Sequence, residues 1–456
     1  MKLTNLLLII LALLLVNCSK NKKEIDYVVF LGTIEGSNID SLKIYDKDNK
    51  PIQTILLSKE LTFNDTLFIP KGYYYIGDFK TSTKLLFLKP SYNLKANIVS
   101  NDQDYSISFQ GIGSNENNYL QEKEKYNKSF TKGVDYKYFM ALNEEGFLKL
   151  SDSIYNEKIN YLNLNLNLGS DFKDYESFSL KYENSQFINT YSQWKGEFIG
   201  DKNFVVSKNF PNPFSNYNIS DEKMIIHPNY SNSIFQVLIN KHKNIYKFPD
   251  INLEFLNILD EEITIEEIKD KLVYTVMKAG IGHTKDLDTI YSKFMSIVKN
   301  KGYRDEIKDT YSNLKKISKG IVSPMFELYD INNRLVTLES LKGKLVYIDI
   351  WGTWCIPCIQ EIPALKMIEK EFRNKDIYFV SISINDKKEN FENFVHEKEL
   401  TGIQLFAPDT KISFFNDYQL KTVPRFILID KEGKIIDANA YKPSDPKLKE
   451  QLLEYL

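Results

Sequence analysis

The stretch "LVYIDIWGTWCIPCIQEIPALKMIEKEF" (345–372) decides the fold of the C-terminal part of the chain. It opens with an apolar run typical of a buried strand, and its second half has the length and composition of a helix. Two cysteines, Cys355 and Cys358, lie where the strand ends and the helix begins. Two thiols at this spacing can form a redox switch, half of a metal site or a structural staple.

The position of the pair favours redox chemistry. A sulfur at the first turn of a helix lies near unpaired backbone N–H groups and the positive end of the helix dipole, which favour its thiolate. Cys358 follows about one helical turn later, close enough to form a disulfide with Cys355. Pro357 suits the first turn, because it has no N–H and its φ is already fixed. We therefore predict that Cys355 attacks a disulfide and that Cys358 resolves the mixed disulfide.

The remaining cysteines and histidines argue against a metal site or a staple. A structural zinc site needs four ligands, the sequence has no second C-x-x-C pair, and its four histidines are scattered singly (His227, His242, His283 and His396). A secreted protein that relied on disulfides for stability would usually carry more pairs, whereas Cys18 is the one other cysteine of the chain. The sequence thus predicts a redox-active disulfide, no metal and no cofactor.

Strands and helices alternate along 320–456. "IYFVSISI" (377–384) is a second apolar strand, and "RFILID" (425–430) with "KIIDANA" (434–440) predicts a hairpin across the turn between them. A last helix is expected in "PKLKEQLLEYL" (446–456). This order of elements predicts an α/β domain.

The strand, "WGTWCIPC" (351–358), the helix and the later "TVPRFILIDKEGKII" (422–436) resemble the thioredoxin superfamily, and within it the exported TlpA/ResA-like thiol–disulfide oxidoreductases. The resemblance implies a thioredoxin-like fold and a cis peptide bond before Pro424, next to the cysteine pair. It also implies that Val423 offers backbone hydrogen bonds to an extended substrate and that Trp354 shapes the substrate surface.

The same resemblance points to two carboxylates as proton handlers. Asp349 matches the buried acid that serves the resolving cysteine in thioredoxins, and burial beside a thiol would raise its pKa. Glu361 matches an acid of the ResA-like branch, and by helix spacing it lies on the face of Cys358. The alternative for either residue is an ordinary surface charge.

Two positions depart from the relatives. Ile356, between the cysteines, stands where Gly or Glu is common, so the reduction potential does not follow from the resemblance. Arg425 stands where thioredoxins usually have Thr. It either favours an acidic substrate edge or is a solvated arginine.

Peroxiredoxins share the thioredoxin-like fold, but in their sequences a proline and a threonine precede the reactive cysteine at fixed spacing. Here Asp349 occupies the position of the proline, and Thr353 lies two residues before Cys355 rather than three. The sequence therefore favours the thiol–disulfide oxidoreductases over the peroxiredoxins.

The N-terminus has the features of an export signal. Lys2 precedes an apolar run over 6–16, which has the length of a signal-peptide core and is too short to span a bilayer. The run ends in "LVNC" (15–18), which resembles a bacterial lipobox, although Asn17 stands where a small residue is usual. The resemblance implies a lipid on Cys18. The alternative is a plain signal peptide in which Cys18 is incidental.

Length and composition limit the number of domains, the size of their cores and the kind of partner that the chain can have. Its 456 residues suffice for roughly two to four domains, and 43% hydrophobic and 13% aromatic residues support sizeable cores. Lys and Arg number 59 against 61 Asp and Glu, so charge gives no reason to expect nucleic acid as a partner.

Two further regions precede the α/β domain. Short strand-like runs about ten residues apart predict an antiparallel β-sandwich over 27–113, and apolar residues at three- and four-residue spacing predict an all-α region after it. This order, with "GIGSNEN" (111–117) at the end of the strands, resembles exported lipoproteins of the Bacteroidetes. The predicted divisions are a signal peptide (1–18), a tether (19–26), a β-sandwich (27–113), a helical region (114–319) and a thioredoxin-like domain (320–456).

These observations predict a cell-envelope thiol–disulfide oxidoreductase. The resembled branch mostly reduces, for instance in cytochrome c maturation, so we expect a reductase whose partners are client proteins with disulfides and an upstream thiol reductant. A lipid would anchor it to a membrane, facing the periplasm, and Ser19 and Lys20 favour the outer membrane. The alternative is a binding or scaffold lipoprotein whose N-terminal domains hold a partner and whose redox domain is a sensor or vestigial.

Overall fold

A computed structural model describes residues 25–36, 39–77, 83–100, 104–133, 136–201, 203–246, 251–284, 286–409 and 412–456. The predicted signal peptide and Cys18 lie outside the described residues. The chain divides into two compact units, Met1–Lys241 and His242–Leu456. This division lies inside the region that the sequence predicts to be helical, 114–319.

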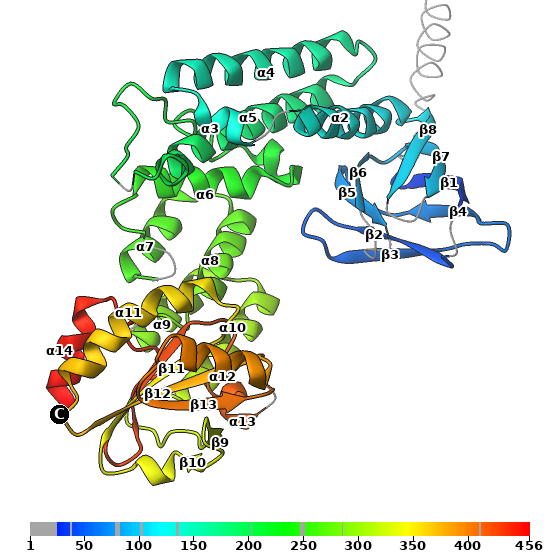
Figure 1. Cartoon of the computed structure of the whole chain (residues 1–456). Helices are drawn as coiled ribbons and strands as arrows, with labels where there is room; N and C mark the ends of the chain where they lie inside the picture. The colour runs from blue at the N-terminus through cyan, green and yellow to red at the C-terminus, as the bar shows by residue number, and fades with distance from the viewer. Residues whose placement is uncertain are drawn as a thin grey trace, which may run out of the picture. The chain divides into compact units, whose positions relative to one another are not determined.

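The first unit begins with two four-stranded sheets (Figure 1). In their spatial order, the strands of one sheet are β4 (Thr62–Leu67), β1 (Val28–Glu35), β7 (Asn93–Ser100) and β8 (Tyr105–Ile112). Those of the other are β3 (Pro51–Leu56), β2 (Ser41–Tyr45), β5 (Gly72–Gly77) and β6 (Thr83–Leu88). Buried side chains of both sheets belong to one hydrophobic core, because every second residue of strands such as β1 points inward.

The prediction that these strands are antiparallel is wrong for one pair. β1 and β7 run parallel, with Val29 beside Asn93 and Glu35 beside Val99, whereas the other neighbouring strands of the two sheets are antiparallel. Five strands separate β1 from β7 along the chain, so no tight hairpin sets their direction. Alternating burial looks the same in either direction, so the sequence pattern could not distinguish the two arrangements.

Helices complete the first unit. They are α2 (Ser114–Gly133), α3 (Tyr136–Ala141), α4 (Glu144–Leu164), α5 (Ser170–Ile199), the short 3₁₀ helix η1 (Glu222–Ile226) and α6 (Tyr230–Lys241). Aromatic residues of α5, among them Phe172 and Tyr175, join the core of the two sheets. Within the described part of the chain, we find no helix with the length and apolar character needed to cross a bilayer.

A buried ion network ties α2 and α5 to the second sheet. The Nζ atom of Lys123 lies 2.9 Å from a carboxylate oxygen of Glu176 and 2.9 Å from one of Glu183. The hydroxyl of Tyr73, on β5, donates to the other Glu176 oxygen at 2.7 Å. The Glu176 charge is therefore paired on both of its oxygens.

The second unit starts with four helices, which are α7 (Leu253–Glu262), α8 (Glu266–Gly280), α9 (Leu287–Ile297) and α10 (Lys301–Lys315). A seven-stranded mixed sheet follows. In spatial order its strands are β10 (Leu335–Thr337), β9 (Glu327–Asp330), β13 (Ile403–Ala407), β12 (Ile377–Ile384), β11 (Leu345–Trp351), β14 (Arg425–Ile429) and β15 (Ile435–Asp437). Its helices are η2 (Glu339–Leu341), α11 (Ile356–Glu371), α12 (Lys388–Glu397), α13 (Ser413–Asp417) and α14 (Pro446–Tyr455).

β11 lies in the centre of this sheet, parallel to β12 and antiparallel to β14. Its side chains alternate between two cores: Tyr347 packs with residues of α11 and α14 on one face, and Ile348 packs with residues of α13 on the other. Figure 1 shows α11 and α14 side by side along one flank of the sheet. The predicted hairpin of β14 and β15 is present, with Ile429 beside Ile435.

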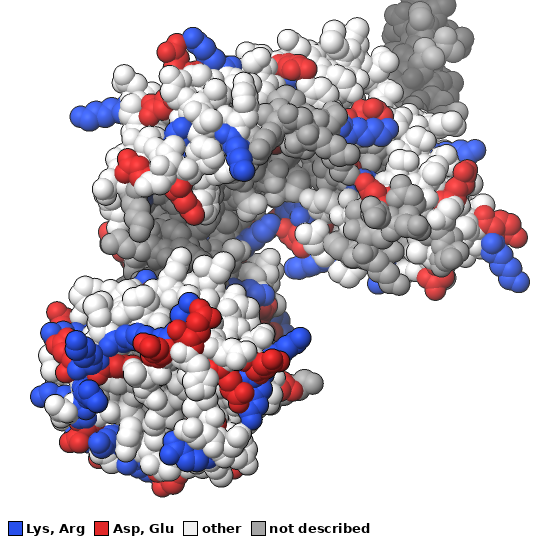
Figure 2. Space-filling view, in the orientation of Figure 1, with Lys and Arg blue, Asp and Glu red and all other residues white. Residues whose placement is uncertain are grey.

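One face of the second unit carries both signs of charge. On the face shown in Figure 2, Lys and Arg side chains are interspersed with Asp and Glu. This matches the near balance of 59 basic and 61 acidic residues in the whole sequence.

Candidate active site

Cys355 and Cys358 form a disulfide at the start of α11, with an S–S distance of 2.03 Å. Cys355 is the N-cap residue, and its sulfur accepts a hydrogen bond from the backbone N–H of Cys358 at 3.2 Å. Both cysteines are 4% exposed and pack with Trp351 and residues of α12. Once the disulfide is reduced, the N–H groups of this first turn favour a negative charge on the Cys355 sulfur.

Asp386, which the sequence analysis missed, holds the loop before the first cysteine. Its carboxylate accepts hydrogen bonds from the backbone N–H and the hydroxyl of Thr353, each at 2.8 Å, and from the hydroxyl of Ser383 at 3.1 Å. Asp386 follows the end of β12, and parallel strands such as β11 and β12 end at the same edge of a sheet. This position could have identified Asp386 from the sequence, because a polar residue at the end of β12 lies beside the start of α11.

The two residues on either side of Cys355 in the sequence have exposed apolar side chains. Trp354 is 53% exposed and Ile356 is 69% exposed. The indole N–H of Trp354 donates to the carbonyl of Ile384 at 3.2 Å, which fixes the ring against the end of β12. A partner protein that reaches the disulfide would therefore meet apolar surface.

The peptide bond between Val423 and Pro424 is cis, as the family resemblance implies. Val423 packs against the cluster that contains both cysteines. Arg425 is not a fully solvated arginine. Its side chain is only partly exposed, and its Nε donates to the carbonyl of Ala438 at 2.9 Å.

Asp349 is not a surface charge. It lies on β11 between Ser381 and Phe426 of the neighbouring strands and is 9% exposed. Burial, together with the negative charges of Glu369 and Glu361, raises the pKa of Asp349 to about 8. Such a carboxyl group can take up and release a proton near neutral pH.

A narrow slot of about 10 Å³ runs beside this acid. Asp349 and Trp351 line it together with Lys366, Glu369 and Thr401. The hydroxyl of Thr401 donates to Glu369, and burial raises the pKa of Glu369. Glu369 could not be singled out from the sequence, because its approach to Asp349 depends on how α11 crosses the sheet.

Glu361 is held by the segment before α14. One of its oxygens accepts from the backbone N–H of Ser444 at 2.8 Å and the other from the Ser444 hydroxyl at 2.9 Å. Lys442 lies 3.1 Å away as an ion-pair partner. The structure therefore gathers both cysteines and Val423 in one cluster, with Trp354 on its rim and Asp349 on the adjoining strand, whereas the carboxylate of Glu361 is engaged by Ser444.

Across the described ranges, no three or more His, Cys, Asp or Glu side chains are grouped in a way that could hold a metal ion.

Comparisons with known proteins agree with this geometry. The Redoxin family model matches residues 319–452. A thiol-disulfide oxidoreductase ResA of Bacillus cereus is 30% identical over 146 residues, which cover 32% of this chain and 81% of that protein. ResA of Bacillus subtilis is 29% identical over 126 residues, or 28% of this chain and 69% of that protein.

Among solved structures, the chain is similar to a solution structure from Bacteroides vulgatus of a protein proposed to be a thiol-disulfide oxidoreductase. The two are 48% identical, with a TM-score of 0.27 and coverage of 28% of this chain and 85% of that chain. The match to a ResA protein over 81% of that protein's length and the disulfide at the start of α11 both identify the family of the C-terminal domain. The chain belongs, through its C-terminal domain, to the TlpA/ResA-like thiol–disulfide oxidoreductases of the thioredoxin superfamily.

Proposed function

We propose that this chain reduces disulfides of client proteins in the cell envelope. The observation that carries the proposal is a disulfide at the N-terminus of a helix, flanked in sequence by the exposed side chains of Trp354 and Ile356 and packed with Val423. Apolar rims suit unfolded or partly folded chains, whose buried residues are accessible. The edge at Val423 and Pro424 is the proposed site for the backbone of the client.

The reaction proceeds in two exchanges. The Cys355 thiolate attacks one sulfur of the client disulfide, forming a mixed disulfide and releasing one client thiolate. The Cys358 thiolate then attacks the Cys355 sulfur, which restores the Cys355–Cys358 disulfide and releases the second client thiolate. An upstream dithiol donates the two electrons and two protons that reduce the pair again.

Asp349 is the proposed base that takes the proton from Cys358. Its pKa of about 8 is close to the pH at which the exchange would run. Glu361 is the second proposed proton handler, and Lys442 and Ser444 fix its position.

Export and anchoring rest on the leader of the sequence. The apolar run over 6–16 and the cysteine at its end support a lipid on Cys18, with the redox domain facing the periplasm. Ser19 and Lys20 favour the outer membrane. Labelling cells with a fatty-acid analogue tests the anchor: the wild-type chain should take up the label, and a Cys18→Ala chain should not.

A trapping experiment tests the reaction. In a Cys358→Ser chain the mixed disulfide cannot be resolved, so clients should remain bound to Cys355 on a non-reducing gel and be released by dithiothreitol. The matched control is Cys355→Ser, which keeps one thiol of the pair but lacks the attacking one. Equal trapping by both variants, or none by Cys358→Ser, would contradict the proposal and favour a binding or scaffold role.

A further inference from the structure

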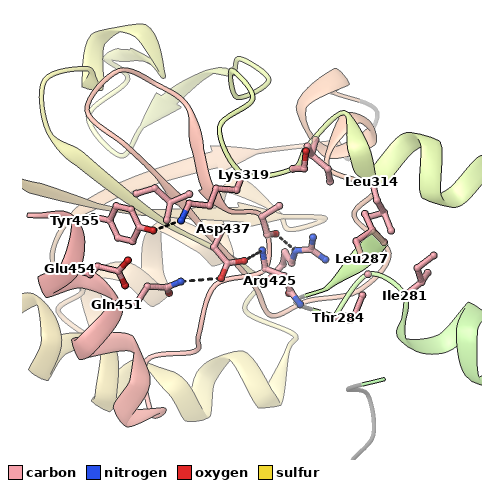
Figure 3. Close-up of a pocket in the computed structure, with 16 residues that line it drawn as sticks. Ile281, Thr284, Leu287, Leu314, Lys319, Arg425, Asp437, Gln451, Glu454 and Tyr455 are labelled. Carbon is pink, nitrogen blue, oxygen red and sulfur yellow. Dashed lines mark hydrogen bonds between the residues drawn. The ribbon is translucent and has the colours of Figure 1, made fainter. Parts of the chain in front are cut away.

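A second cavity lies in the C-terminal unit, and neither cysteine lines it. It has a volume of about 320 Å³ and lies where the ends of α8 and α10 meet β15 and α14 (Figure 3). Its lining includes none of residues 351–358. The volume is at the lower end of the range for small-molecule sites, so it suits a small ligand.

Arg425 provides a positive charge in this cavity. Its Nε is occupied by the carbonyl of Ala438, but its two Nη groups have no hydrogen-bond partner among the residues that the structure describes. Burial lowers the pKa of Arg425, whereas the negative charge of Asp437 opposes that shift. Asp437 thus supplies an opposite charge nearby, but the Nη donors themselves have no acceptor in the described part of the chain, and leaving partly buried donors without an acceptor is costly.

The other polar groups around the cavity are largely engaged. The Asp437 carboxylate accepts from the side chain of Gln451 at 3.0 Å and from the backbone N–H of Asn439 at 2.9 Å. Lys319 donates to the hydroxyl of Tyr455 at 2.6 Å. Figure 3 shows these pairs on the side of β15 and α14. The Nη groups of Arg425 are therefore available as paired donors, and a planar carboxylate matches their geometry.

Apolar side chains form another part of the lining. Ile281, Leu287 and Leu314 come from the helical segment that runs from α8 to α10, and Figure 3 shows them together on one side of Arg425. Glu454 also lines the cavity, and Figure 3 places it beside Gln451 and Tyr455, on the α14 side. A ligand with a negative end and an apolar body would complement Arg425 and the helical segment at the same time.

We propose that this cavity binds a small organic acid, with its carboxylate on the Nη groups of Arg425 and its apolar body against Ile281, Leu287 and Leu314. The site is separate from the disulfide exchange proposed above. It requires no redox step, and binding should be the same in a Cys355→Ser/Cys358→Ser chain.

Calorimetric titration of the full chain with 3-phenylpropionate tests the charge requirement. We expect saturable binding of the acid and at least tenfold weaker binding of 3-phenylpropanamide, which has the same shape without the charge. Acetate, which lacks the apolar body, should also bind at least tenfold more weakly. Amide or acetate binding as tight as that of 3-phenylpropionate, or no binding of 3-phenylpropionate, would overturn the proposal.

Variants of the arginine locate the site. Arg425→Gln should weaken the binding of 3-phenylpropionate at least tenfold, and Arg425→Lys should recover part of the loss because it restores the charge without the planar pair of donors. Arg373→Gln, which removes an exposed arginine on the same unit, is the matched control and should leave binding unchanged. Unchanged binding in Arg425→Gln would overturn the assignment. Because the wild-type comparison of acid and amide needs no variant, a folding defect in Arg425→Gln leaves that test intact.

Discussion

Each of the two units buries a carboxylate, but the two carboxylates have opposite surroundings. Glu176, in the first unit, is 1% exposed, and Lys123 and Tyr73 bind its two oxygens. Asp349, in the second unit, is also buried, but the charged groups that act on it most strongly are the acids Glu369 and Glu361. One acid is compensated by a cation, and the other is opposed by like charges.

This difference distinguishes a buried carboxylate that stabilises the fold from one that can take part in a reaction. A paired buried charge holds elements together, and removing its partner is costly. A buried acid without a cation instead stays protonated to an unusually high pH and can exchange its proton near neutrality. Asp349 lies on the strand that leads to the disulfide, whereas Glu176 lies in the core of α2, α5 and β5.

The largest expected effect is in the compensated region. Lys123→Met leaves the buried charge of Glu176 without its cation, whereas Glu183 keeps Lys158 at 3.0 Å, so we expect it to lower the free energy of unfolding of the first unit by about 3–5 kcal/mol. The control on the same helix is Lys125→Met, which breaks an exposed pair with Glu122 and should cost under about 1 kcal/mol.

Urea unfolding checks this prediction through the fluorescence of Trp194, in a background where Trp351 and Trp354 are replaced by Phe. Equal losses for the two lysine variants would show that the buried network contributes no more than a surface pair.

The second prediction concerns the uncompensated acid and depends on pH. In the folded chain Asp349 keeps its proton up to a pKa of about 8, whereas in the unfolded chain it ionises near its ordinary value of 3.8. Between these values folding takes up a proton, so the Asp349 contribution makes the second unit less stable as pH rises. Asn cannot ionise. Asp349→Asn should therefore match the wild type near pH 4 and exceed its stability by roughly 2–5 kcal/mol at pH 8.

The measurement is urea unfolding of the oxidised chain at pH 4, 6 and 8, followed by Trp351 and Trp354 fluorescence with Trp194 replaced by Phe. Asp376→Asn is the control, because Asp376 is exposed and should show no such trend. A stability difference between Asp349→Asn and wild type that is the same at all three pH values would contradict the account of Asp349.

The same substitution should slow the exchange itself. Without the Asp349 carboxyl, Cys358 loses its proposed base, so we expect the reduction of a model protein disulfide such as that of insulin to slow by about tenfold or more. The pH profile of the wild-type rate should lose its inflection near pH 8 in Asp349→Asn. An unchanged rate and profile would leave Asp349 as a buried acid without a part in the reaction.

A smaller effect is expected at Glu361. Because Ser444 and Lys442 already occupy its carboxylate, Glu361→Gln should slow the same reaction only about threefold, and less than Asp349→Asn. Ser444→Ala removes one of these hydrogen bonds and keeps the charge of Glu361. If Ser444→Ala slows the reaction as much as Glu361→Gln, then Glu361 acts by holding the segment before α14 rather than by moving a proton.

What the sequence predicts well in this chain is local. The strand, the two cysteines and the helix of 345–372 are adjacent in sequence, so period, spacing and the Pro357 position indicate the fold and the disulfide together. Asp349 could be predicted for the same reason, because it lies on the strand that ends at the two cysteines. The raised pKa of Asp349 could not be predicted in the same way, because Glu369, which contributes to it, lies two helical turns beyond Glu361 on α11.

Features that depend on distant segments were not predicted. The parallel pairing of β1 with β7 brings together strands with five others between them. The Lys123–Glu176 pair looks in sequence like two ordinary helix charges, because burial comes from the sheets that pack on them. Arg425 follows the cis proline, yet its side chain enters a cavity lined by the helical segment. No local pattern carries that information.

The reduction potential of the Cys355–Cys358 pair tests the central claim most directly. The full chain is equilibrated with defined ratios of reduced and oxidised dithiothreitol or glutathione, and the fraction of disulfide is counted after thiol alkylation. A chain that reduces client disulfides should have a potential near about −270 mV, as thioredoxin does. A value near about −120 mV, typical of a strong oxidant such as DsbA, would contradict the proposed function.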